Sequence, residues 1–166
     1  SLFWTSPDVN NLGVPYTESF DEGGLLDLWL VDGGDNWLYD EATGNPAPSM
    51  IFNWSPSVTD YSQSLYAPVL PLGDLTSVTV SFDYELNIWS PSGAEFFSIE
   101  YKSGTDADWS VLELFDNAGE SFDFTNFSYD LTGLSGSLFF RFHAYGANSF
   151  DLNWHRVDNF SVSAPG

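Results

Sequence analysis

The chain has 166 residues, 18% of them aromatic, and its 24 acidic residues outnumber three cationic ones, giving a formal net charge of −21. The many aromatic side chains argue against a disordered chain, and the acidic surface argues against nucleic acid and anionic membranes as partners. The chain has no cysteine, which excludes thiol catalysis, thiolate zinc sites and iron–sulfur clusters.

The first residues, 1–15, are expected to be a lead-in to a core module over residues 16–164, the whole chain 1–166 being a single domain. This lead-in has neither a basic start nor a continuous apolar run, so it does not resemble a signal peptide. No apolar stretch approaches the roughly 20 residues of a membrane span. We therefore expect a domain that does not insert into membranes and is part of a longer polypeptide.

The next part of the chain carries few strand signals. Residues 33–64 are rich in turn formers and are expected to be long loops with little regular structure. Residues 64–72 form an extended strand, which Pro68 and Pro71 restrict to a sheet edge or an irregular stretch.

The clearest strand signal lies in residues 78–89. Apolar residues occupy every second position from Val78 to Ile88, and the intervening positions are mostly polar. Period-two alternation over this length is typical of a strand with one face in the core and one in water.

Several more strands are expected after it. Their ranges are 96–102, 109–115, 124–131, 137–145 and 157–163, with a turn at 103–108. Short strands at this spacing, with no helical periodicity, predict an all-β fold, a jelly-roll β-sandwich of two antiparallel sheets in a single domain.

Several motifs, taken in order, resemble those of gingipain-type cleaved-adhesin and choice-of-anchor J modules, which are related to MAM domains. They are ESFDEGG followed by Trp29, then VDGGDNW, SLYAPVLPL, IEYKSGTDADWSVL, YDLTGLSGSLFFRFHAYG and WHRVDNFSVS. The resemblance covers about residues 16–164. It implies a jelly-roll sandwich, frequent calcium binding, and a role as an adhesion or substrate-targeting unit of a larger secreted protein rather than an enzyme. The chain differs from the family pattern at Arg156, where related terminal strands often carry another acid.

A structural calcium ion (Ca2+) is the sharpest site hypothesis. Calcium prefers about six to eight oxygen ligands, and the first and last strands of a sandwich lie close together. Asp21 and Asp158 are therefore candidate metal ligands, and Asp32 and Asp35 could add oxygens or form a second site. The alternative is that these acids are turn formers on a solvated face.

A second candidate site lies on residues 137–145. If Phe140, Phe142 and Ala144 face the core, then Arg141, His143 and Tyr145 lie together on the outer face with Phe139. Aromatic rings beside planar hydrogen-bonding groups are typical of sugar and peptide sites. Two alternatives stay open: Arg141 could pair with Asp83 or Glu85, or the strand could have the opposite phase.

Tryptophans expected in loops are the third candidate. Trp37, Trp54 and Trp89 could stack on a ligand. Trp29, Trp109 and Trp154 lie at motif positions and are expected to be structural.

The sequence thus predicts a non-catalytic carbohydrate-binding module, extracellular or at a bacterial cell surface, tethered to other domains. Its ligand would be a polysaccharide or cell-surface glycan, neutral or weakly charged because the net charge disfavours acidic polymers. The alternatives are a protein–protein adhesion domain without a glycan site and, remotely, a glycoside hydrolase with two catalytic acids. Neither His143 nor His155 lies in a known catalytic motif.

Overall fold

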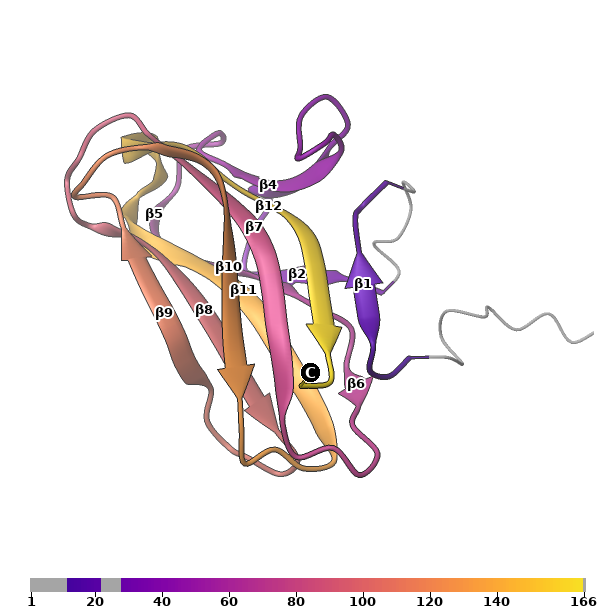
Figure 1. Cartoon of the computed structure of the whole chain (residues 1–166). Coiled ribbons are helices and arrows are strands. Elements are labelled where there is room, and N and C mark those ends of the chain that lie inside the picture. The colour runs from indigo at the N-terminus through magenta and orange to yellow at the C-terminus, as the bar shows by residue number, and fades with distance from the viewer. Residues whose placement is uncertain (1–11, 22–27, 166) are drawn as a thin grey trace, which may run out of the picture.

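A computed structural model describes residues 12–21 and 28–165. It forms two antiparallel sheets that face each other across one core (Figure 1). This confirms the predicted all-β sandwich. The strands are β1 (Tyr16–Glu18), β2 (Leu30–Asp32), β3 (Trp37–Asp40), β4 (Ser49–Asn53), β5 (Thr59–Tyr66), β6 (Leu70–Pro71), β7 (Val78–Ile88), β8 (Glu95–Ser103), β9 (Ser110–Asp116), β10 (Phe122–Leu131), β11 (Ser137–Asn148) and β12 (Leu152–Ser163), with a short 3-10 helix, η2 (Ser149–Asp151), before β12.

One sheet, named here the β7 sheet, has the order β10-β7-β12-β4-β3, with β1 also paired to β12. The other, named the β11 sheet, has the order β2-β5-β11-β8-β9, with β6 also paired to β11. Figure 1 shows β10, β7 and β12 in front of β9, β8 and β11. The strand pairs described in both sheets are all antiparallel.

Aromatic side chains fill the space between the sheets. Tyr84 of β7 stacks on Phe97 of β8 with ring centroids 4.5 Å apart, and Phe82 meets Phe142 edge to face at 5.0 Å. Burying a large apolar side chain stabilises a fold by about 1.5–3 kcal/mol, and well-placed ring pairs add to this. The alternation predicted for β7 is confirmed, because Val78, Val80, Phe82, Tyr84 and Leu86 are all buried.

The expectation of long loops over residues 33–64 was wrong, since β3, β4 and most of β5 lie there. The reason is that neither β4 nor β5 has a readable alternation. β4 is buried along most of its length, and β5 buries the polar residues Gln63 and Ser64. The Gln63 side-chain amide donates to the Asn36 Oδ1 at 2.7 Å and accepts from the Asn36 main-chain N–H at 3.0 Å. These tertiary hydrogen bonds allow a polar residue, which is typical of loops in a sequence, to be buried in a strand.

Candidate binding site

The outer face of the β11 sheet carries the strongest candidate site. Strand β11 buries Phe140, Phe142 and Ala144, so its intervening residues face outward. Arg141, His143 and Tyr145 therefore lie along one face, as expected, and the opposite phase is excluded.

The cross-strand register brings further side chains to this face. Arg141 lies between Tyr66 of β5 and Glu100 of β8, and Tyr145 lies between Ser62 and Phe96. Antiparallel neighbours in register point to the same side of a sheet, so these residues form one surface with Arg141, His143 and Tyr145. We name this surface the β11 face.

Glu100 is at the centre of the β11 face, although only 5% of its surface is exposed. The Arg141 Nε donates to its Oε1 at 2.6 Å, and the His143 Nδ1 lies 3.0 Å from its Oε2. Burial by itself would raise the pKa of Glu100, but hydrogen bonds from His143 and Arg141 outweigh it and lower the pKa to about 2. Glu100 is therefore a fixed anion that orients both basic side chains.

A hydroxyl completes this chain of hydrogen bonds. The Ser62 Oγ lies 2.7 Å from the His143 Nε2. Because ionised Glu100 can only accept, the His143 Nδ1 donates to it, and Nε2 is the ring atom that faces the Ser62 hydroxyl. Tyr66 extends the network, since it accepts from Arg141 at 3.3 Å and donates to Asp32 at 3.1 Å.

Aromatic rings lie at both ends of this polar centre. Near the start of β9, the Arg141 guanidinium lies 4.3 Å from the Trp109 ring centroid, and the Lys102 Nζ lies 4.9 Å from it. Further along β11, Tyr145 stacks on Phe96 with centroids 5.2 Å apart. The β11 face thus presents polar groups in fixed positions between two aromatic ends.

The three tryptophans predicted to lie in loops and stack on a ligand differ in burial and in position. Trp37 is not in a loop but in β3, where it is 4% exposed and packs on Phe52 and Phe97, so its prediction as a ligand-stacking residue was wrong. Trp54 directly follows β4, and Trp89 directly follows β7. Both lie beside η2 and are not part of the β11 face. Trp54 is half-buried against Phe150, whereas Trp89 is 65% exposed.

Trp109 was expected to be structural and is instead part of the β11 face. Sequence reasoning also missed Tyr66, Phe96, Glu100 and Lys102. The alternation within β8 could have placed Phe96, Glu100 and Lys102 on an outer face. Only the register between strands places them beside Arg141.

Neither expected partner of Arg141 pairs with it. Asp83 and Glu85 belong to the other sheet, where Arg156 takes Glu85 at 2.8 Å and Asp40 at 3.2 Å. Arg156 also stacks on Trp154, its guanidinium 4.2 Å from the ring centroid.

The predicted metal ligands Asp21 and Asp158 are close enough to interact electrostatically. Burial, and then the charges of Asp21 and Asp83, raise the pKa of Asp158 to about 6. Both carboxylate oxygens of Asp158 accept main-chain N–H groups, from Asn45 and Asn159, each at 2.7 Å. A buried carboxylate with a raised pKa would gain from a cation.

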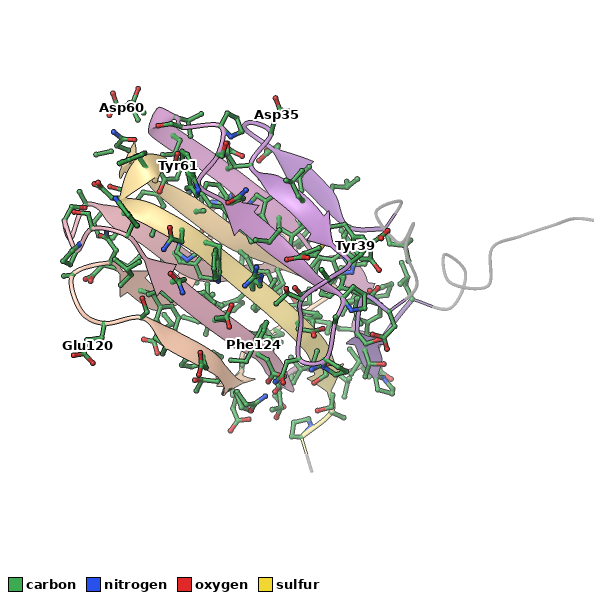
Figure 2. All side chains as sticks on the ribbon, turned by 90° about the horizontal axis from the view of Figure 1, so that it is seen from above. Asp35, Tyr39, Asp60, Tyr61, Glu120 and Phe124 are labelled. Carbon is green, nitrogen blue, oxygen red and sulfur yellow. The ribbon has the colours of Figure 1, made fainter. Side chains whose placement is uncertain are left out.

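The other two predicted ligands do not join this pair. Asp32 is in β2, in the other sheet from Asp158, and Asp35 is an exposed turn residue, which Figure 2 shows at the outer margin of the molecule. Across residues 12–21 and 28–165, no three or more His, Asp or Glu side chains gather as a metal site. Asp21 directly precedes residues 22–27, which lie outside the described part of the chain. In the same described ranges, no helix has the length and apolar character needed to cross a membrane.

Comparison with known proteins gives matches among solved structures only. No family model and no curated protein matches the sequence. The K1 cleaved adhesin domain of Lys-gingipain from Porphyromonas gingivalis W83 matches with a TM-score of 0.68 and 16% identity, covering 93% of this chain and 100% of that chain.

Two carbohydrate-binding modules have the same fold. TmCBM61, solved in complex with β-1,4-galactotriose, matches with a TM-score of 0.65 and 13% identity over 89% of this chain and 94% of its own. The CBM22-1 xylan-binding domain of Paenibacillus barcinonensis Xyn10C matches with a TM-score of 0.55 and 15% identity over 93% and 98%. The chain therefore has the β-sandwich fold of the gingipain-type cleaved-adhesin domains, which these carbohydrate-binding modules share.

Proposed function

We propose that the chain is a non-catalytic carbohydrate-binding module and that the β11 face is its binding site. The observation that carries this proposal is the fixed polar centre of Glu100, Arg141 and His143 between the aromatic ends at Trp109 and Tyr145. Sugars present both apolar ring faces and hydroxyl groups, and such a surface offers a partner to each.

The dimensions of the β11 face suit a glycan chain rather than a single sugar. From Phe139 to Tyr145, β11 advances six residues, which is about 20 Å at roughly 3.3 Å per residue. TmCBM61 is solved with galactotriose, and the CBM22-1 domain of Xyn10C is a xylan-binding domain. They support, for this chain, an oligosaccharide as the ligand class.

The cellular setting is also part of the proposal. We expect the module to act outside the cell as one part of a larger bacterial protein. Tethering is useful because several linked weak sites bind a glycan more tightly than a single site does. Protein–protein adhesion is the second candidate, favoured by the fold shared with a cleaved adhesin domain. Glycan binding has the better support because the β11 face combines aromatic rings with oriented polar groups.

The series Ser62, His143 and Glu100 also matches the order of a hydroxyl, imidazole and carboxylate in acyl-transfer enzymes. In those enzymes the carboxylate supports the imidazole, whereas here Arg141 also binds Glu100 and balances its charge. We therefore assign these residues to ligand orientation. Covalent labelling of Ser62 by a fluorophosphonate would contradict this assignment.

Calcium is proposed as a structural ion at Asp21 and Asp158. The two carboxylates fit calcium's preference for oxygen ligands. The raised pKa of Asp158 shows that its buried negative charge is unfavourable, and a bound cation would stabilise that charge. The remaining oxygens would come from main-chain carbonyls and water. Asp32 and Asp35 are proposed only as a separate, weaker site.

The binding proposal is tested by titrating the chain with a panel of soluble oligosaccharides. Trp109→Ala should weaken binding roughly 2- to 30-fold, the equivalent of about 0.5–2 kcal/mol for a lost aromatic contact. Trp154→Ala is the matched control, because Trp154 also stacks on an arginine but lies in the other sheet.

Two other results would change the proposed site or the proposed function. If Trp89→Ala weakens binding and Trp109→Ala does not, the site is at the end of the sandwich beside η2. If no oligosaccharide binds the folded chain, protein adhesion becomes the leading function.

A further inference from the structure

The distribution of positive charge on this acidic chain is uneven. The chain has only three lysine and arginine residues, Lys102, Arg141 and Arg156. Two of them, Lys102 and Arg141, lie within 5 Å of the centroid of one ring, that of Trp109. This concentration bears directly on which glycan the proposed β11 face would take.

The two arginines are already neutralised. Arg141 is paired with Glu100, and Arg156 is paired with Asp40 and Glu85. Their carboxylate partners are within 3.2 Å and largely buried, so these guanidinium groups have little charge left for a ligand.

Lys102 differs from both. Among the described residues, no carboxylate lies within 4 Å of its ammonium group, although Asp106 and Asp108 are in the adjoining turn. The ammonium instead lies over Trp109 and Phe139, at 4.9 and 5.7 Å from the ring centroids. In a chain with 24 acids, an ammonium group that lies on aromatic rings with no ion-pair partner among the described residues is available to an incoming anion.

The net charge does not cancel this local effect. At physiological ionic strength charges are screened over about 8 Å, so acids on the opposite sheet act weakly at Lys102. An ammonium next to a ring on which a sugar stacks is placed to meet a carboxylate at the edge of that sugar. A lone ammonium suits a singly charged carboxylate, because the bidentate donors of Arg141 are already occupied by Glu100.

We propose that the β11 face is selective for acidic glycans and that Lys102 binds the carboxylate of a uronic acid whose ring stacks at Trp109. This inference rests on the proposed glycan-binding function and specifies its substrate class. It differs from the neutral glycan expected from net charge, because the position of one lysine, and not the total charge, decides the contact.

The test uses pairs of ligands in which one member carries carboxylates and the other has a related neutral structure. The probes are oligogalacturonate and its methyl ester, and glucuronic-acid-substituted and unsubstituted xylo-oligosaccharides, titrated at 0.15 M salt. The wild-type chain should bind the acidic member of at least one pair about 5- to 20-fold more tightly. Lys102→Met should remove that preference, because the acidic member loses more affinity than the neutral member, whereas Lys102→Arg should retain most of it.

Arg156→Met is the matched control, because it removes the same charge from the other sheet and should not alter the preference. A second readout does not depend on affinity differences. Lys102 is the only lysine in the chain, so acetylation by an amine reagent, followed by mass spectrometry, should slow at Lys102 when the acidic oligosaccharide is saturating.

The outcomes separate this inference from the function on which it rests. Equal binding of both members of every pair, or stronger binding of the neutral member, overturns the acidic selectivity and leaves glycan binding intact. Binding of neither member of any pair overturns both. An unchanged preference in folded Lys102→Met rejects Lys102 as the carboxylate ligand.

Discussion

At the scale of single residues, burial sets the charge of His155. His155 of β12 is 2% exposed, stacks on Phe97 at 4.5 Å and lies 2.7 Å from the Tyr84 hydroxyl through its Nδ1. Burial lowers the pKa of His155 to about 3. The ring is therefore a neutral core residue that accepts from Tyr84, and it takes no part in the β11 face.

This neutral histidine predicts a loss of stability in acid. The folded pKa of His155 is below its ordinary value of 6.5, so its contribution is complete above pH 6.5 and decreases as the pH falls toward 3. At pH 4.5 the loss should be about 2.5 kcal/mol, because the pH is then two units below the ordinary pKa and each unit is worth about 1.4 kcal/mol. Chemical denaturation of the wild type at pH 7 and pH 4.5 measures it.

The double variant His155→Leu with Tyr84→Phe removes both polar partners and should lose about 2.5 kcal/mol less between these two pH values. Other titrating groups are common to both proteins and cancel in the difference. Equal losses would show that His155 is not the source of the acid sensitivity.

At the scale of elements, strands β7 and β12 bring two acids directly opposite each other. Asp83 and Asp158 are cross-strand partners, and like charges in such positions repel. Asparagine side chains lie between them: Asn45 and Asn159 both donate to Asp83, at 3.1 and 2.8 Å. The loop between β3 and β4, which carries Asn45, is thereby held on the outer face of the β7 sheet.

The raised pKa of Asp158 makes this pairing depend on pH. Because its folded pKa is about 6 and its ordinary value is 3.8, ionisation of Asp158 costs stability as the pH rises from 3.8 to 6. In chelator, the stability of the wild type relative to Asp158→Asn should therefore be lower at pH 7 than at pH 4. Unfolding by urea measures this difference, and Asp74→Asn, which changes an exposed loop acid, is the control.

Calcium bound at Asp158 should offset the loss of stability that ionisation of this residue causes. A cation that binds the folded chain stabilises it by mass action, so added calcium should raise the melting temperature of the wild type at pH 7 and leave Asp158→Asn nearly unaffected. Identical wild-type melts in calcium and in chelator would reject the calcium proposal without affecting the pH prediction.

At the scale of the whole molecule, three cationic residues offset 24 acidic ones only slightly, which leaves a net charge of −21. Exposed acids lie at widely separated places, such as Asp35, Asp60 and Glu120 in Figure 2. Surplus like charge destabilises a compact state through repulsion over its surface.

Monovalent salt should therefore stabilise the fold. Raising sodium chloride from about 10 mM to 500 mM shortens the screening length from about 30 Å to below 8 Å, so the melting temperature in chelator should rise by several degrees. Chloride is used because sulfate stabilises proteins by exclusion from their surface. A constant melting temperature would indicate that the acidic surface serves solubility alone.

The sequence alone determined the fold class and the faces of the most regular strands. The alternation in β7 and β11 identified the residues that are buried and the outward placement of Arg141, His143 and Tyr145. It could do so because alternation is a local property: successive side chains in a strand point to opposite faces.

Only the tertiary structure decided which outward residues meet. Glu100 and Trp109 are far from Arg141 in the sequence and reach it through the pairing of β8 with β11 and β9. Register is fixed by contacts between strands, and a one-residue shift would move each side chain to the other face. The burial of Trp37 and Gln63, like the position of Lys102 over Trp109, depends on packing that no local pattern records.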